Sequence, residues 1–97
     1  MKVHFLPSYK PSKRMMAIFT QEHGHPIIIH FGEGCAYTLH KDKNRRDLYN
    51  SRFSRINIYD RDVNMFNPEV LNRYIFNGPN TDIKKNQSLY RYVFDLQ

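Results

Sequence analysis

Two short apolar runs near the start of the chain constrain the fold more than any other feature of the sequence. Residues 15–19 and 27–31 are rich in apolar, β-prone side chains, and the polar segment QEHGHP lies between them. This pattern predicts an antiparallel β-hairpin that turns near Gly24. Ile27 and Ile28 would point to opposite faces of the hairpin, so both faces are apolar. We therefore expect the hairpin to be covered on both sides or to lie in the middle of a sheet.

A shorter strand and a punctuated segment precede the hairpin. Val3 and Phe5 alternate with polar residues, which predicts a strand that Pro7 ends. Prolines and serines then recur through residues 7–13, which predicts an extended arm or linker with Tyr9 as its aromatic anchor.

The segment after the hairpin combines a glycine-bracketed loop with a basic helix. Gly32 and Gly34 permit a sharp turn because glycine adopts backbone angles that other residues resist. Either Thr38 or Asp42 is a candidate N-cap for the helix that follows. Helical spacing predicts that one face of this helix carries Tyr49, Phe53 and Ile56.

Capping residues predict two further helices. Asn67 precedes a proline and a glutamate, a combination typical of a helix start, and Gly78 with the following proline predicts the end of that helix. A last helix is expected to follow Asn80 or Thr81. The sequence thus predicts one α+β domain spanning residues 1–97, in which an N-terminal β-hairpin or small antiparallel sheet packs against about three helices.

Composition limits the class of protein and its surroundings. The 97 residues include seven Tyr and seven Phe, enough apolar surface for one small core. The net charge of +6 favours anionic partners, which include nucleic acid, an acidic protein surface and a membrane headgroup layer. A single cysteine, Cys35, suits a reducing compartment, and no run of residues is apolar enough to predict a signal peptide or a membrane span. We expect a protein that is not secreted.

The strongest functional signal is a cluster of cations in and around the basic helix. Residues 41–55 hold six cations and two carboxylates, a net charge of +4. Positive side chains at the start of a helix are repelled by the positive end of its dipole. Binding of an external anion would offset this repulsion. The candidate anion-binding residues are Lys41, Lys43, Arg45, Arg46, Arg52 and Arg55. A solvated helix face is the alternative interpretation, since exposed charges most often contact only water.

No enzyme, cofactor or metal is predicted. His40, Lys41 and Asp42 are contiguous, so they do not match the spaced histidine and lysine of a phospholipase D type motif. Residue order alone supports no nucleophile–base pair. Five residues could in principle meet at a zinc ion, but none has a standard ligand spacing. These are His23, His25, His30, Cys35 and His40.

The core segment resembles an uncharacterised family of short basic proteins of large DNA viruses of algae and protists and of some phages. In this pattern an F-G-x-x-G loop precedes a Y-T-x-H-K-D string and then a basic R-[RK]-x-x-Y-x-x-R helix. The matching positions are Phe31, Gly32, Tyr37, Thr38, His40, Lys41, Asp42, Arg45, Arg46, Tyr49 and Arg52. The chain departs from the pattern in its shorter GEGC loop and in Phe76, which stands where the family more often has tryptophan.

The resemblance implies a viral source and a place in the virion or the interior of the host cell, and it implies no particular chemistry. It also directs attention to the residues of the loop and the helix start, Gly32, Gly34, Tyr37, Thr38, His40 and Asp42. Two functions follow. The first is a non-enzymatic module that binds nucleic-acid backbone through the basic helix. The alternative is a minor capsid or cement-type virion protein that binds other virion proteins, with Tyr9 and Phe76 as candidate contacts.

Overall fold

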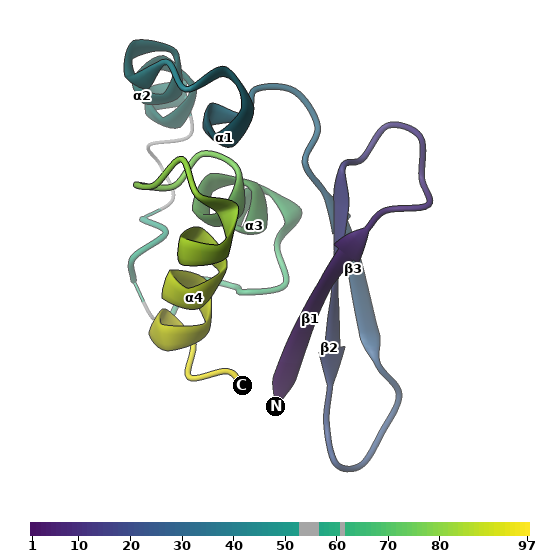
Figure 1. Cartoon of the computed structure of the whole chain (residues 1–97). Helices are drawn as coiled ribbons and strands as arrows, with labels where there is room; N and C mark the ends of the chain where they lie inside the picture. Colours follow the sequence, from purple (N-terminus) through teal and green to yellow (C-terminus); the bar gives the residue numbers. More distant parts are fainter. Residues whose placement is uncertain (53–56, 61) are drawn as a thin grey trace.

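The computed structural model describes residues 1–52, 57–60 and 62–97, which form a small antiparallel sheet beside a layer of helices (Figure 1). The sheet has the strand order β1-β2-β3, with β1 at Lys2–Pro7, β2 at Met15–Thr20 and β3 at Ile27–Phe31. The helices are α1 (Tyr37–His40), α2 (Lys43–Arg52), α3 (Pro68–Ile75) and α4 (Ile83–Val93). The predicted α+β class with a small N-terminal sheet is confirmed.

The sheet buries one face against the helices and leaves its other face open in the described part of the chain. Val3, Phe19 and Phe31 point toward the helices and are at most 1% exposed. On the opposite face Leu6 and Ile28 remain 46% and 44% exposed. The described helices lie on one side of the sheet (Figure 1), so the cover expected on both sides of the hairpin is not found. β3 is an edge strand instead of a central one.

The segment at residues 7–13 lies at the connection between β1 and β2 and is held to the sheet. The hydroxyl of Ser8 lies 2.7 Å from Nδ1 of His30, and the Tyr9 ring meets the His30 ring edge-on with centroids 4.7 Å apart. Lys13 forms an ion pair with Glu33 beyond the end of β3. These contacts fix the connection at both of its ends, although Tyr9 itself remains 73% exposed.

α3 forms the centre of the core, because all its residues from 70 to 75 are buried. The Asn67 side chain accepts the backbone N–H of Glu69 at 2.8 Å, which confirms the predicted cap. Beyond the helix, Phe76 is only 4% exposed, so it belongs to the core and is not available to a partner. Gly78 is tightly enclosed: a Cβ at this position would lie 2.2 Å from the carbonyl oxygen of Tyr74.

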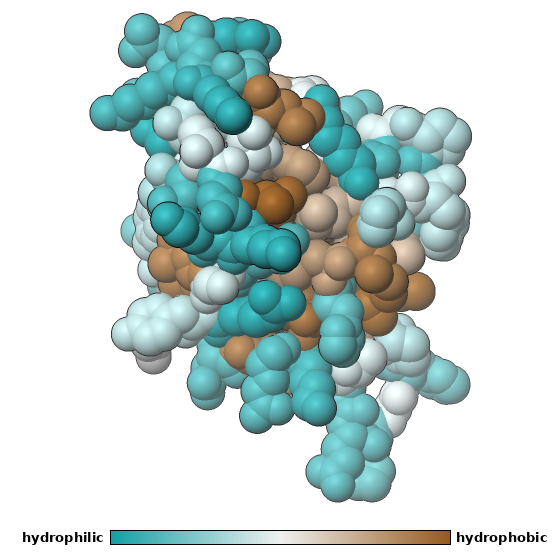
Figure 2. All heavy atoms as spheres, in the orientation of Figure 1, coloured by the Kyte–Doolittle hydropathy of each residue, from teal (hydrophilic) through white to brown (hydrophobic). Residues whose placement is uncertain are grey.

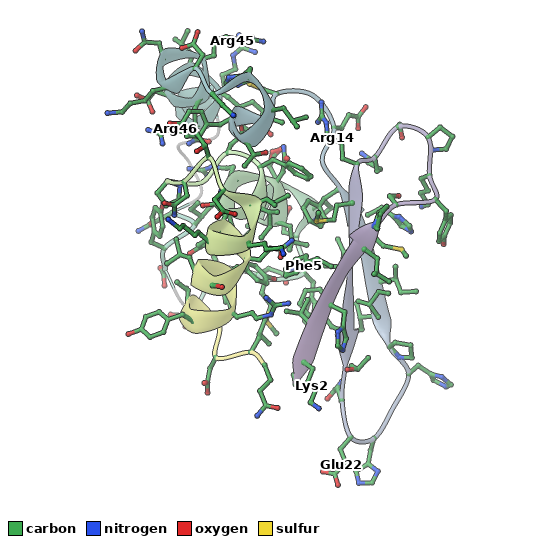
Figure 3. The ribbon with its side chains drawn as sticks, viewed as in Figure 1. Lys2, Phe5, Arg14, Glu22, Arg45 and Arg46 are labelled. Carbon is green, nitrogen blue, oxygen red and sulfur yellow. The ribbon has the colours of Figure 1, made fainter. Side chains whose placement is uncertain are left out.

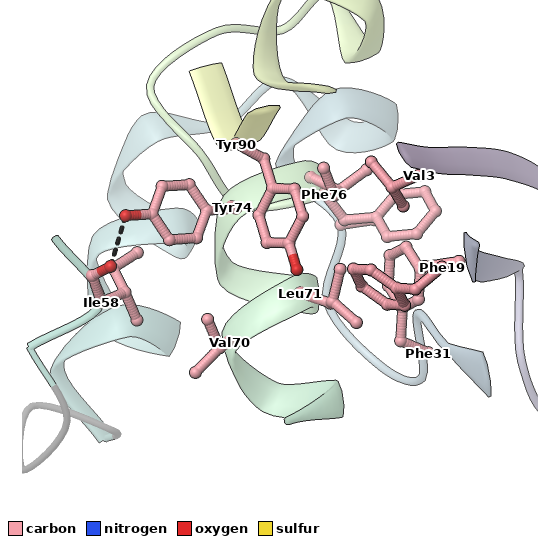
Figure 4. Packing of buried hydrophobic residues seen from close by; sticks show 12 residues of the cluster. Val3, Phe19, Phe31, Ile58, Val70, Leu71, Tyr74, Phe76 and Tyr90 are labelled. Atoms are coloured by element: carbon pink, nitrogen blue, oxygen red, sulfur yellow. Dashed lines mark hydrogen bonds between the residues drawn. The ribbon is translucent and has the colours of Figure 1, made fainter. Parts of the chain in front are cut away.

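Aromatic side chains join α3 to α4 and to the chain before α3 (Figure 4). The rings of Tyr74 and Tyr90 meet edge-on with centroids 5.6 Å apart. The Tyr74 hydroxyl donates to the carbonyl oxygen of Ile58. Burial raises the pKa of Tyr74 to about 12 and also raises the pKa of Tyr90. Both phenols are therefore kept neutral by the fold.

α4 begins later than its predicted start. The Asp82 side chain accepts the backbone N–H of Lys84 at 2.9 Å, so Asp82 is the N-cap. The backbone of Asn80 is used elsewhere, because its N–H donates to the buried Asn86 side chain at 3.1 Å. Tertiary contact thus moves the helix start by one or two residues.

The two ends of the chain lie side by side below α4, next to the start of β1 (Figure 1). The backbone N–H of Val3 donates to the carbonyl oxygen of Gln97 at 2.9 Å, and the N–H of Gln97 donates to the carbonyl oxygen of Met1 at 3.1 Å. Arg91 of α4 strengthens this corner by stacking on Phe5, with its guanidinium carbon 5.1 Å from the ring centroid. No helix within the described residues combines the length and the apolar character needed to cross a membrane.

Candidate anion-binding surface

The H-K-D string forms a sharp break between α1 and α2. Lys41 adopts a left-handed conformation with φ 59°, which ends α1. The backbone N–H of Asp42 donates to Nδ1 of His40 at 2.9 Å. The Asp42 carboxylate then accepts the N–H groups of Asn44 at 3.0 Å and Arg45 at 3.3 Å. Asp42 is therefore the cap of α2, and the single basic helix expected from the sequence is two helices.

Thr38 does not cap the basic helix. It lies inside α1, where its backbone N–H donates to the carbonyl oxygen of Phe76 at 3.0 Å. Tyr37 is anchored similarly, because its N–H donates to the side-chain oxygen of Asn77 at 3.0 Å. The Asn77 amide in turn donates to the carbonyl oxygen of Cys35 at 2.7 Å. A buried asparagine thus fixes the start of α1 against the end of α3.

The glycine loop is held from two sides. Gly32 has φ 95°, and a Cβ there would lie 2.7 Å from the Phe76 ring, so the backbone can approach the core only as glycine. Arg14 donates to the carbonyl oxygen of Gly32 at 2.6 Å and lies over the Phe76 ring (Figure 3). Gly34, with φ 82°, faces open space. The loop is an anchored connection at Gly32 and an exposed turn at Gly34.

Four of the six predicted cations are exposed on α2 and on the turn before it. No ion pair to a carboxylate is found for any of them within the described residues. The first turn of α2 contains no acidic residue of its own. The nearest carboxylates in the sequence are those of the Asp42 cap and of Asp47, and Asp47 is paired with Arg46. Arg45 points outward from this end of the molecule (Figure 3), in a region that is largely hydrophilic (Figure 2). The four cations are Lys41, Lys43, Arg45 and Arg52.

Arg46 differs from its neighbours because the chain itself engages it. Its guanidinium donates to Asp47 at 2.9 and 3.1 Å and to the carbonyl oxygen of Gly78 at 3.4 Å. The same group lies over the Tyr37 ring, and its side chain is only 14% exposed. Arg46 therefore ties α2 to α1 and to the segment after α3. Arg55, the sixth predicted cation, lies outside the described residues, as do Phe53 and Ile56 of the predicted apolar face.

Tyr49 attaches the opposite side of α2 to α3. Its hydroxyl donates to the Glu69 carboxylate at 2.9 Å and accepts from the Asn72 amide at 2.5 Å. Burial, together with the hydrogen bond to Glu69, raises the pKa of Tyr49. α2 thus has internal attachments at Arg46, at Tyr49 and at Asn50, whose side-chain amide donates to the carbonyl oxygen of Asn77 at 3.2 Å. They hold the exposed cations on a fixed support.

The structure brings together two residues that sequence order did not pair. Sγ of Cys35 lies 3.1 Å from Nε2 of His40, across the start of α1. Cys35 is half-buried. The only sequence signal was their five-residue separation, which places both at the ends of one helical turn. His30 bonds to Ser8 instead, and within the described ranges no group of three or more potential ligands could hold a metal.

Comparison of the chain with models of protein families, with curated proteins and with solved structures gave no match. The fold and the basic surface therefore define the class of protein only coarsely, as a small α+β protein with an exposed cationic helix. The viral family resembled by the core segment stays a prediction.

Proposed function

We propose that this protein is a small, basic, non-enzymatic module of a large DNA virus that binds nucleic-acid backbone through the α2 surface. The α2 surface consists of Lys41, Lys43, Arg45 and Arg52. One observation carries the proposal: these four cations are exposed and have no ion-pair partner among the described residues, while the adjacent Arg46 is engaged internally. Cations that lack internal partners remain free to neutralise phosphates.

The arrangement suits a polyanion better than a single small anion. Arg45 and Arg52 are seven residues apart, so they lie on one face of α2 at a separation of about 10 Å along the helix axis. Lys41 and Lys43 lie on either side of the Asp42 cap, so the positively charged surface continues past the start of α2. A helix that presents several cations over such a length can contact successive phosphates, and each contact releases a counterion.

The experiment is a fluorescence anisotropy titration of labelled single-stranded and duplex DNA across a series of salt concentrations. Four phosphate contacts predict a slope of about −3.6 for log affinity against log salt on duplex DNA. The salt dependence should be much weaker in a quadruple variant that carries Lys41→Gln, Lys43→Gln, Arg45→Gln and Arg52→Gln. The matched control removes the same charge from other exposed sites, and its salt dependence should stay close to that of the native protein. It carries Lys2→Gln, Lys10→Gln, Lys84→Gln and Lys85→Gln.

Two outcomes would reject the proposal. Absence of binding at low salt would exclude a nucleic-acid partner. Equal loss of affinity in both quadruple variants would show that net charge, and not the α2 surface, attracts DNA. Displacement of DNA by poly-glutamate at the same charge concentration would identify an acidic protein as the preferred partner.

A second function, a minor capsid or cement-type protein of the virion, is favoured by a different observation. The open face of the sheet exposes apolar side chains that no described element covers, including Leu6, Tyr9 and Ile28. Exposed apolar patches mark protein contacts. Mass spectrometry of purified virions would test this role, which requires the protein to be present in them at a fixed copy number.

A further inference from the structure

The two edges of the sheet differ in how their backbone groups are used. On β1 the N–H of Val3 donates to the carbonyl oxygen of Gln97, and the carbonyl oxygen of Val3 accepts from the Arg91 guanidinium at 3.1 Å. Both backbone groups of Val3 therefore point away from β2. Because these directions alternate along an antiparallel strand, the even-numbered residues of β1 bond to β2, and the odd-numbered residues of β2 bond to β3.

The same alternation leaves the backbone groups of Ile28 and His30 at the outer edge of β3. Their register partners on β2 are Ile18 and Met16, whose own backbone groups face β1. Within the described part of the chain no hydrogen bond from outside the sheet reaches the N–H or carbonyl groups of Ile28 and His30. The outer edge of β3 therefore presents donors and acceptors that match those of a neighbouring strand.

β3 also lacks the features that keep an exposed edge from pairing. Proteins blunt such edges with lysine, proline or a covering segment. β1 has all three, because it contains Lys2 and Pro7 and the C-terminus lies beside it (Figure 1). β3 has the sequence IIIHF and contains neither lysine nor proline. An apolar edge of this kind is a template for a further strand.

We propose that the outer edge of β3 pairs with the same edge of a second copy of this chain. The two strands run antiparallel about a two-fold axis, so the two sheets join into one continuous sheet. The contact does not involve the α2 surface, so this pairing and the proposed nucleic-acid binding can each be rejected without the other.

One register uses every outward backbone group of β3. In it Ile28 of each copy lies opposite His30 of the other, and each of these two pairs exchanges both N–H···O bonds. Ile29 lies on the axis, opposite its own counterpart. The neighbouring register in one direction places His30 opposite Pro26, which has no N–H. In the other direction Ile28 would lie opposite Gly32, whose φ of 95° ends the strand.

Side chains and charges near β3 fit a second copy in this register. Ile29 is half-buried on the helix side of the sheet, and across the axis it would pack against Ile29 of the second copy. The exposed carboxylate of Glu33, which follows β3, lies at the level of His25 of the second copy. An imidazole N–H can donate a hydrogen bond to a carboxylate. The two-fold axis repeats this contact, so both ends of the paired strands are electrostatically complementary although each chain carries a net charge of +6.

The oligomeric state of the full chain tests the proposal. Paired five-residue strands bury less area than a standard interface, so the dimer should be weak. Sedimentation equilibrium should show an average mass that rises from one chain toward two between about 10 µM and about 1 mM. A mass that stays at one chain at the highest concentration would overturn the proposal and leave the edge to a strand of another protein. Growth beyond two chains would exclude the closed two-fold pairing.

Two substitutions of one residue separate the backbone edge from its side chains. Ile28→Pro removes an outward N–H and places the proline ring against the second strand, while the hydrogen bonds between β2 and β3 stay intact. It should raise the concentration at which half the chains are dimeric by about tenfold or more. Ile28→Ala shortens the side chain but keeps the N–H, and should raise that concentration by about threefold or less. Equal effects of the two substitutions would contradict pairing through the backbone.

Cysteine cross-linking tests the register and does not require the proline variant to fold. Cys35→Ser first removes the natural thiol. Ile29→Cys then places two thiols across the axis with their Cα atoms about 4.5 Å apart, within disulfide range, so oxidation should link two chains. Ile27→Cys is the matched control on the same face of β3. Its counterpart lies about 14 Å away along the strands, so cross-linking should be at least about tenfold slower. Equal rates for the two variants would indicate random collision and overturn the proposed pairing.

Discussion

The guanidinium carbon of Arg46 lies 4.7 Å from the centroid of the Tyr37 ring, which joins the first turn of α2 to α1. Among the described residues no ring contact is found for the adjacent Arg45, whose side chain points to solvent (Figure 3). Two neighbouring arginines in one basic run therefore have different roles. One stabilises the support of the α2 surface, and the other forms part of the surface itself.

This difference predicts that two similar substitutions change the free energy of unfolding by unequal amounts. Arg46→Ala removes the ring contact and the hydrogen bond to Gly78, and should lower the free energy of unfolding by about 2 kcal/mol. Arg45→Ala should change it by less than about 0.5 kcal/mol, because an exposed cation at the start of a helix contributes little. Urea unfolding measures both. Equal destabilisation would show that Arg46 is not an internal attachment.

Gly78 should tolerate no side chain. A Cβ there would lie 2.2 Å from the Tyr74 carbonyl oxygen and 3.0 Å from the Asn86 side chain, so Gly78→Ala must displace the end of α3. We expect a loss of about 3 kcal/mol or more in the free energy of unfolding. Gly34→Ala is the control, since Gly34 has positive φ but open surroundings and should lose only about 1 kcal/mol. A similar loss in both variants would contradict the steric argument.

Stability should fall steeply in alkaline solution. The folded pKa values of Tyr49, Tyr74 and Tyr90 are raised, so each phenol stays protonated in the fold at a pH where the unfolded chain ionises. Their contribution is complete below the unfolded pKa of about 10 and is lost as the pH rises toward the folded values. Within that pH range, each phenol lowers the free energy of unfolding by about 1.4 kcal/mol per pH unit.

Two measurements check this expectation. Urea unfolding at pH 8, 9.5 and 10.5 should give a free energy that is flat at first and then declines. Absorbance of tyrosinate should show that Tyr49, Tyr74 and Tyr90 stay protonated until the protein unfolds. Ionisation of these three phenols at about pH 10 in protein that is still folded would refute the prediction.

The elements predicted well from the sequence depend on local patterns. Two apolar, β-prone runs separated by a polar segment predicted the hairpin at β2 and β3, and the Asn67 cap predicted the start of α3, because both signals lie within a few residues. The sequence predicted the cationic surface as a list of charges. It did not distinguish Arg46, whose partners include the carbonyl of Gly78 far along the chain.

The remaining errors come from contacts between distant segments. The break between α1 and α2 at Lys41 depends on the hydrogen bond that anchors Tyr37 to Asn77, forty residues away. No local sequence pattern predicts this contact. The pairing of Cys35 with His40 depends on the same anchored turn. The sequence makes Phe76 a candidate contact with a partner, but in the structure it is buried and fills the space above Gly32 after α3 has ended.

The pairing of Gln97 with Met1 and Val3 gathers both chain ends at one pole of the molecule, while α2 lies at the other (Figure 1). A biotin or dye attached at either end would therefore sit far from the cationic helix. Protein immobilised on a sensor chip through such a tag would face the flowing solution with α2 first, whichever end carried the tag.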